Sequence, residues 1–193
     1  MKKVLEKFFD YAYDNEIEIY NEFSLQHELG IYLRNILPKY KIEFERNVDC
    51  FNIDKHKTIK KEIDISIIKG TEKFAIELKF PRNGQYPEQM YNFIKDIKFL
   101  EQLKEHKFKK VFSVVLVDDT NFYKYSKHQK EKEIYSSFRN QNFNIKINKK
   151  ILKPTGKTKE SIILNNDYNI KWKDCKLFNN NKSCKYYILE AKN

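Results

Sequence analysis

Apolar residues recur at a helical period near the start of the chain. Residues 2–13 and 22–37 are each predicted to form an amphipathic helix, because their apolar side chains fall three or four positions apart. Asn21 or Ser24 is expected to cap the second helix. That helix is expected to end before Pro38, since proline cannot continue a helix.

Alternation of apolar and polar residues then predicts strands over residues 41–48, 60–68 and 73–80. The last two strands are separated only by Lys69–Glu72, a short segment that is typical of a hairpin turn. With Gly70 at the centre of this turn, the two strands are predicted to pair as an antiparallel hairpin.

The turn determines which residues of the hairpin face each other. One face is expected to be entirely apolar, with the pairs Ile63–Leu78, Ile65–Ile76 and Ile67–Phe74. The other face then has Asp64 opposite Glu77 and Glu62 opposite Lys79. A slip of one residue would set isoleucines against charges, and burial of one face forbids it.

A helix and a buried strand are predicted after the hairpin. Residues 86–107 have a helical period, and the continuously apolar residues 111–117 are expected to form a strand buried on both faces. Together with residues 73–80 they form a parallel strand–helix–strand unit. We therefore predict an α/β fold with a mixed central sheet flanked by helices. Weaker patterns predict a helix near 130–140 and strands over 142–148, 160–164 and 185–190.

Charge divides the chain, which is expected to form a single domain over residues 1–193. Residues 1–119 contain 21 Lys and Arg and 21 Asp and Glu, whereas residues 120–193 contain 17 and 6. The basic C-terminal part is expected to complete the sheet and to contact nucleic acid, because excess positive charge favours a polyanion partner. A solvated lysine-rich surface is the alternative.

Composition excludes several classes of protein. The charged fraction is 34%, and no stretch approaches the roughly 20 apolar residues that a membrane-spanning helix needs. Glu6 and Asp10 interrupt the apolar start of the chain, which argues against a secretory signal. Cys50, Cys175 and Cys184 lack metal-site spacing, so we expect reduced thiols in a cytoplasmic protein.

The polar face of the predicted hairpin carries the candidate chemistry. Two carboxylates directly opposite each other, Asp64 and Glu77, repel by about 0.2–1 kcal/mol on a sheet face. A divalent cation removes that repulsion, and Mg²⁺ prefers a few carboxylates together with water and phosphate oxygens. Lys79 points to the same side and could orient or deprotonate a water, or stabilise charge on a phosphate. A surface hairpin with ordinary salt bridges is the alternative.

The same residues carry a family resemblance. Asp64 and the segment Ala75–Phe80, with twelve residues between Asp64 and Glu77, resemble the PD-(D/E)XK, or restriction-endonuclease-like, nucleases. The order of predicted elements over residues 22–118 matches that family's helix, strand, hairpin, helix and strand. The resemblance implies Asp64, Glu77 and the Leu78 carbonyl as metal ligands, Lys79 as the catalytic lysine, and Glu28 as an assisting acid.

The match departs from the family pattern at two positions. Ile63 stands where many relatives have a proline before the aspartate. Some relatives carry a glutamine and, four residues later, a tyrosine on this helix. Here Gln89 has Phe93 four residues later, so Gln89 is a secondary candidate. Glu62 is another secondary candidate, as a substitute ligand or as the ion-pair partner of Lys79.

The sequence thus predicts Mg²⁺-dependent cleavage of DNA phosphodiester bonds, with Mn²⁺ able to substitute. A role in restriction, repair or mobile elements is expected, RNA is left open as a substrate, and a homodimer is one arrangement found among relatives. A non-catalytic nucleic-acid-binding module with the same fold is the alternative. Candidate nucleic-acid contacts are Arg82, Asn83, Lys146, Lys149, Lys150, Lys153 and Lys157.

Overall fold

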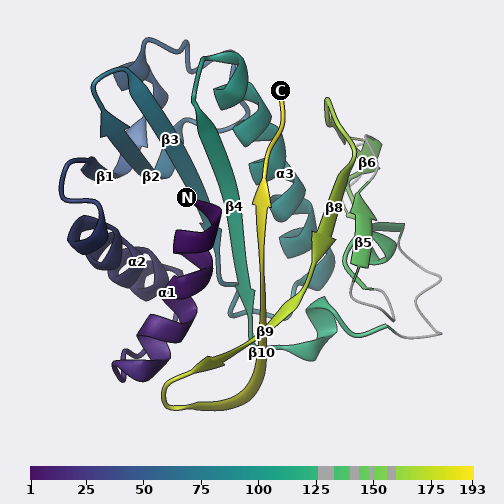
Figure 1. Cartoon of the computed structure of the whole chain (residues 1–193). Coiled ribbons are helices and arrows are strands. Elements are labelled where there is room, and N and C mark those ends of the chain that lie inside the picture. Colours follow the sequence, from purple (N-terminus) through teal and green to yellow (C-terminus); the bar gives the residue numbers. More distant parts are fainter. Residues whose placement is uncertain (126–132, 140–143, 148–149, 156–159) are drawn as a thin grey trace.

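The computed structural model describes residues 1–125, 133–139, 144–147, 150–155 and 160–193 (Figure 1). Within these ranges the chain forms one six-stranded sheet, two small two-stranded sheets and three α-helices. The predicted α/β class with a mixed sheet is therefore confirmed.

The large sheet has the strand order β1-β2-β3-β4-β10-β9. Only β3 and β4 run parallel, and the other neighbouring pairs are antiparallel. The parallel pair arises because a helix connects these two strands, as the sequence predicts. The strands are β1 Lys41–Asn47, β2 Glu62–Lys69, β3 Glu72–Lys79, β4 Lys110–Val117, β9 Lys173–Leu177 and β10 Asn180–Glu190.

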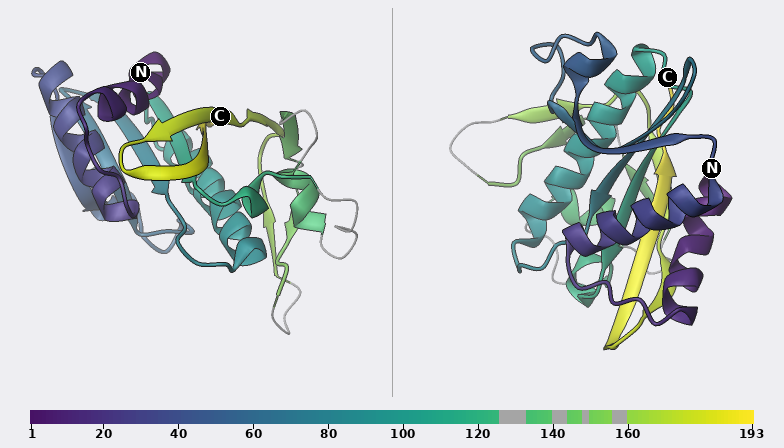
Figure 2. Two further views of the ribbon diagram at one scale, coloured as in Figure 1. Left: turned by 90° about the horizontal axis from the view of Figure 1, so that it is seen from below. Right: turned by 90° about the vertical axis from the view of Figure 1, so that its left-hand side faces the viewer.

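Helices cover both faces of the sheet. Helices α1 (Lys2–Asp14) and α2 (Glu22–Ile36) pack on one face, and α3 (Tyr86–Glu105) packs on the other (Figure 2, right). Each face has its own apolar core, so β4 is buried on both sides, as its continuous apolar sequence predicts. Asn21 and Ser24 cap α2 by exchanging side-chain and backbone hydrogen bonds of 2.8 and 3.0 Å.

The hairpin has the predicted register. Lys69 pairs with Glu72, and Ile65 pairs with Ile76. Gly70 adopts a positive φ of 57° in the turn, a conformation that glycine accepts without strain. The predicted pairing is thus confirmed from the turn as far as Ile65.

Beyond Ile65 the two strands of the hairpin separate. Ile63 packs in the core on the α3 side of the sheet, whereas Leu78 packs in the core under α1 and α2. The expectation that Ile63 shares an apolar face with Leu78 is therefore wrong. The backbone N–H of Leu78 donates to the Asp64 carboxylate at 2.7 Å. Beyond the Ile65–Ile76 pair, the Asp64 side chain thus takes the place of a backbone acceptor for the N–H of Leu78.

The C-terminal part adds two strands to the large sheet and a layer across α3. Strand β5 (Asn144–Ile147) pairs with β8 (Tyr168–Lys171), and β6 (Lys150–Leu152) pairs with β7 (Ser161–Ile163). These small sheets share one apolar core with α3. Trp172 lies in that core and its indole N–H donates to the Phe138 carbonyl at 2.9 Å, so its role here is packing.

The weaker sequence patterns succeed in part. Strands are confirmed near 142–148, 160–164 and 185–190, whereas β6, β8 and β9 are not anticipated. Instead of a helix over 130–140, the described residues show a 3-10 turn at Glu133–Ser137, in addition to 3-10 turns at Val48–Phe51 and Thr120–Phe122. None of the helices in the described ranges is long and apolar enough to cross a membrane.

Candidate active site

Asp64 and Glu77 meet where β2 and β3 separate. The Asp64 backbone N–H donates to a Glu77 carboxylate oxygen at 3.3 Å, and the Leu78 N–H donates to the Asp64 carboxylate at 2.7 Å. Each acid therefore binds the backbone of the opposite strand, and this holds the two carboxylates together. Glu77 is 1% exposed, so the site is deep.

Lys60, which lies just before β2, places its ammonium group among the acids. Its Nζ contacts Glu77, lies 2.9 Å from Asp96 Oδ1 and 3.8 Å from Asp64 Oδ1. The preceding loop is fixed to α3, because the Ile59 N–H donates to the Gln102 side chain at 2.9 Å. Lys60 was not predicted as a site residue, because nothing in its flanking residues distinguishes it from other lysines.

Asp96 comes from α3 and links the two lysines of the site. Its Oδ1 faces Lys60, and its Oδ2 lies 3.7 Å from Lys79 Nζ. Asp96 is 2% exposed, so its charge is compensated mainly inside the protein. The sequence contained a signal for Asp96, because this acid falls within the stripe of apolar residues on α3, between Phe93 and Leu103. A charged residue in such a stripe is expected to be buried.

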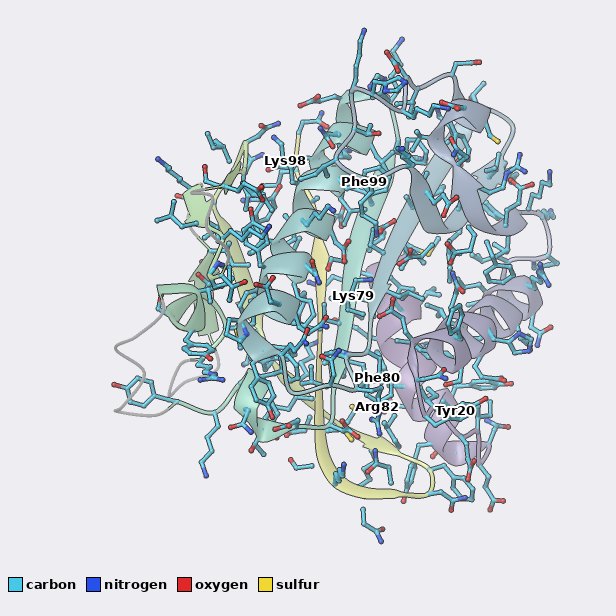
Figure 3. All side chains as sticks on the ribbon, turned by 180° about the vertical axis from the view of Figure 1, so that it is seen from behind. Tyr20, Lys79, Phe80, Arg82, Lys98 and Phe99 are labelled. Atoms are coloured by element: carbon cyan, nitrogen blue, oxygen red, sulfur yellow. The ribbon has the colours of Figure 1, made fainter. Side chains whose placement is uncertain are left out.

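Lys79 is held at the end of β3 by several oxygen atoms. Its Nζ lies 2.9 Å from Glu22 Oε1 and 2.7 Å from the Leu78 carbonyl oxygen. The second Glu22 oxygen accepts the Phe80 N–H at 3.0 Å, so Glu22 joins the start of α2 to the end of β3. Figure 3 shows Lys79 with α3 on one side and the α1–α2 region on the other.

Negative charge exceeds positive charge in this cluster. Four carboxylates surround two ammonium groups: Asp64, Glu77, Asp96 and Glu22 against Lys60 and Lys79. Burial raises the pKa of Asp64 to about 6, although both lysines lower it. Burial, followed by the charge of Asp64, raises the pKa of Glu77 well above its usual range. Both shifts indicate buried carboxylates whose charge is under-compensated.

The acids also determine the state of the lysines. Burial alone would lower the pKa of Lys79, but Asp96, Glu22 and Asp64 together raise it above its usual value. The same balance between burial and the surrounding carboxylates raises the pKa of Lys60. Both side chains are therefore ammonium ions at neutral pH. Lys79 can orient water or stabilise negative charge, but it is a poor general base in this state.

The donor set fits a divalent cation in chemistry. Asp64, Glu77 and Asp96 supply hard carboxylate oxygens. The Leu78 carbonyl belongs to the residue whose N–H binds Asp64, and it accepts from Lys79 at 2.7 Å. The surplus of negative charge is what a divalent cation would neutralise. Among the described residues no group of three or more His, Cys, Asp and Glu side chains is already arranged as a metal site. The ammonium of Lys60 lies among the three acids instead.

Glu28, the assisting acid predicted on α2, is displaced from the site. Glu22 and Gln26 are the α2 residues that reach it, and the Gln26 amide donates to the Asp64 carbonyl at 2.9 Å. Glu28 is six residues after Glu22, which turns it by about 240° around the helix. It lines a separate hollow with His27. The prediction of Glu28 is therefore corrected to Glu22.

Two secondary candidates also lie elsewhere. Gln89 donates to the Asn83 side chain at 3.1 Å near the start of α3, and Asp96 is the residue of that helix that faces the site. Glu62 is exposed and lies opposite Asn47 in the β1–β2 register. Lys79 forms ion pairs with Glu22 and Asp96. The expected Glu62–Lys79 ion pair is therefore wrong.

The candidate nucleic-acid contacts are dispersed. Arg82 lies beyond Phe80 at the exit of β3 and pairs with buried Asp118 at 2.5 Å (Figure 3). Asn83 is exposed beside it. Exposed Lys150 lies in β6, and Lys153 and Glu160 pair at the adjoining ends of β6 and β7. This small sheet lies on the far side of α3 from Lys79 (Figure 3). Lys149, Lys157 and the side chain of Lys146 lie outside the described residues.

A small hollow reaches Asp64, whereas Glu77 and Asp96 do not line it. It has a volume of about 50 Å³. Phe23, at its rim, has 77% of its surface exposed. The aromatic side chain thus stands in solvent beside a charged site. The hollow is lined by Glu22, Phe23, Gln26, Glu45, Asp64 and Leu78.

Comparison with known proteins adds no relative. No protein-family profile, no curated protein and no solved structure matches the chain.

Proposed function

We propose that this protein is a metal-dependent nuclease of the PD-(D/E)XK class that hydrolyses DNA phosphodiester bonds. The observation that carries the proposal is the meeting of Asp64 and Glu77 beside Lys79 in a buried cluster with surplus negative charge. Buried acids that are under-compensated cost folding free energy, and binding a cation recovers it. Phosphodiester hydrolysis requires a cation, a water molecule and a phosphate in one place.

Each residue has a role in this proposal. Asp64, Glu77 and the Leu78 carbonyl would hold Mg²⁺, or Mn²⁺ in its place, with Asp96 as a further oxygen donor. The bound ion would supply Lewis-acid chemistry and lower the pKa of water. Lys79, as an ammonium ion, orients the attacking water or stabilises the negative charge that develops on the phosphate. Glu22 positions Lys79 and fixes the end of β3 against α2.

One observation favours a second candidate, a non-catalytic nucleic-acid-binding module with this fold. The Lys60 ammonium already compensates part of the charge of the three acids. A chain that uses lysine permanently in this way would need no metal. It would still bind nucleic acid through its basic C-terminal part, with affinity that falls steeply as salt rises.

Cleavage assays test the proposal directly. Linear, circular, single-stranded and branched DNA, together with RNA, would be incubated with the wild-type protein in Mg²⁺, in Mn²⁺ and in EDTA. We expect cleavage that requires the cation, and Lys79→Ala should slow it by at least about 100-fold because charge on the phosphate loses its partner.

Lys73→Ala is the matched control. Lys73 lies on β3 six residues before Lys79, on the same side of the strand, and contacts Phe108 and the His106 carbonyl instead of the acids. Its loss should leave the cleavage rate within a few-fold of wild type. Salt-dependent DNA binding without cleavage in either metal would favour the binding module, and equal rates for wild type and Lys79→Ala would refute the assigned mechanism.

A further inference from the structure

The Lys60 ammonium group contacts three of the four acids in the site, whereas that of Lys79 contacts two. The Lys60 Nζ contacts acids from three elements: Asp64 on β2, Glu77 on β3 and Asp96 on α3. Two of these acids are the expected metal ligands. The oxygen atoms that face Lys60 are therefore among those that a divalent cation would need.

The backbone near Lys60 is anchored, but its side chain is not fully buried. Ile59 is bound to Gln102, and Lys61 accepts a backbone hydrogen bond from Val48 at 2.8 Å, so the residues on both sides of Lys60 are fixed. The side chain of Lys60 retains 21% exposure. Rotation about its four side-chain bonds can therefore carry the ammonium toward solvent without movement of the backbone.

Charge balance gives this movement a direction. An ammonium ion and a divalent cation repel each other, so they compete for the same carboxylate oxygen atoms. Counted as fully ionised, the four acids and two lysines have a surplus of two negative charges. A divalent cation compensates that surplus even if the Lys60 ammonium stays near the acids. Lys60 therefore needs to leave only the oxygen atoms that the cation binds.

We propose that Lys60 is an exchangeable counter-ion, which holds the acids together in the metal-free protein and competes with the divalent cation for them. This inference rests on the proposed function, because it needs a cation that binds Asp64 and Glu77. The released ammonium would keep its positive charge near the site, because the backbone around Lys60 is fixed.

Calorimetric titration of the full chain with Mn²⁺, without nucleic acid, tests the competition. Lys60→Met keeps the apolar length of the side chain and removes its charge. We expect it to bind Mn²⁺ at least about tenfold more tightly than wild type, because an opposing charge is removed within 4 Å of the acids. The metal-free variant should melt at a lower temperature, and saturating Mn²⁺ should raise its melting temperature more than that of wild type.

Lys98→Met is the matched control. Lys98 has the same side-chain exposure of 21% and pairs with Glu101, a buried acid on the same helix. Figure 3 shows that Lys98 lies away from Lys79 toward the other end of α3. We expect its Mn²⁺ affinity to equal that of wild type, so a general loss of positive charge would not explain tighter binding by Lys60→Met.

The outcomes separate this inference from the proposed function. Mn²⁺ binding by wild type, with equal or weaker binding by Lys60→Met, overturns the inference alone. Absence of Mn²⁺ binding in both proteins overturns the inference and the proposed function together. If Lys60→Met and Lys60→Gln are unfolded without metal, recovery of the wild-type circular dichroism spectrum in Mn²⁺ supports the competition, and failure to recover overturns it.

Discussion

Helix α3 carries two buried acids that are compensated in different ways. Glu101 is bound mainly by donors from residues 165–168: the N–H groups of Asn165 and Asn166 at 2.8 and 3.0 Å and the Tyr168 hydroxyl at 2.8 Å. Lys98 is its ammonium partner, at the longer distance of 3.5 Å. Asp96 faces two ammonium groups, and its Oδ2 has no hydrogen-bond partner in the described structure, with Lys79 at 3.7 Å. Both acids are at most 2% exposed.

The difference separates a structural acid from an acid of a chemical site. Backbone N–H groups are fixed by the fold, so those that bind Glu101 cannot leave when another cation arrives. The lysines that compensate Asp96 carry their charge on side chains with four rotatable bonds, and they share that charge among four acids. Burial of a carboxylate alone therefore does not identify a functional site. What identifies it is a compensating charge that can be exchanged.

Glu101→Ala should have the largest effect on stability. It removes the acceptor of the Asn165 and Asn166 N–H groups and the Tyr168 hydroxyl, and the ion-pair partner of Lys98, in a position where Glu101 has no exposed surface. We expect the free energy of unfolding to fall by about 3–5 kcal/mol. Urea unfolding followed by circular dichroism measures this loss. Metal affinity of the fraction that remains folded should not change, and a specific loss of Mn²⁺ binding would contradict the structural role.

Asp96→Asn should show the opposite pattern. It reduces the surplus of negative charge but removes a partner of both lysines and a donor of hard oxygen. We expect Mn²⁺ affinity to fall by about 10–100-fold, as for residues that support metal ligands. Stability of the metal-free protein should stay within about 1 kcal/mol of wild type, since relief of repulsion offsets the lost ion pairs.

Calorimetry and urea unfolding of the same Asp96→Asn sample separate the two effects. Unchanged Mn²⁺ affinity together with a stability loss as large as that of Glu101→Ala would place Asp96 in the same structural class as Glu101. The two acids of α3 would then no longer differ, and the assignment of Asp96 to the site would be withdrawn.

Local rules were sufficient to predict the hairpin. Alternation of apolar residues and a glycine turn determine the register, so the meeting of Asp64 and Glu77 follows from the sequence. The separation of the strands beyond Ile65 could not be predicted, because it depends on side chains that bind the opposite backbone. Ile63 was therefore assigned to the wrong face.

The rest of the site depends on packing between distant elements. Asp96 carried a signal, as a charge within an apolar helical stripe, but that signal does not reveal which lysines it meets. Lys60 is positioned by a loop bound to α3, and Glu22 by the angle at which α2 meets β3. Helix periodicity alone does not give that angle, and Glu28 was chosen in place of Glu22.

The C-terminal part shows a similar limit for charge. Its excess of basic residues is evident from composition, but several of its lysines pair locally with acids, such as Lys153 with Glu160 and Lys173 with Glu6. The small sheets lie across α3 from Lys79 (Figures 1 and 3). Net charge therefore supports a polyanion partner without locating its binding surface.

Tyr168→Phe should have the smallest effect, and it tests how much one donor contributes to the compensation of Glu101. The Tyr168 hydroxyl donates to Glu101 at 2.8 Å and accepts the Lys192 N–H at 3.2 Å. Its removal leaves the Glu101 charge with the two backbone donors and the longer contacts to Lys98 and the Asn166 side chain, so we expect a loss of about 1.5 kcal/mol in the free energy of unfolding. Mn²⁺ affinity and DNA cleavage should match wild type, because the acids around Lys60 are untouched.

Tyr186→Phe provides the comparison for this small change. Tyr186 is a buried tyrosine that stacks on Phe9 at 4.2 Å, on the face of the sheet opposite to α3, and phenylalanine retains that stacking. We expect it to cost less stability than Tyr168→Phe. If the two variants lose equal stability in urea, the hydroxyl contributes little to the compensation of Glu101. Its charge would then depend on the backbone donors and Lys98, and the contrast with Asp96 would rest on fixed N–H groups alone.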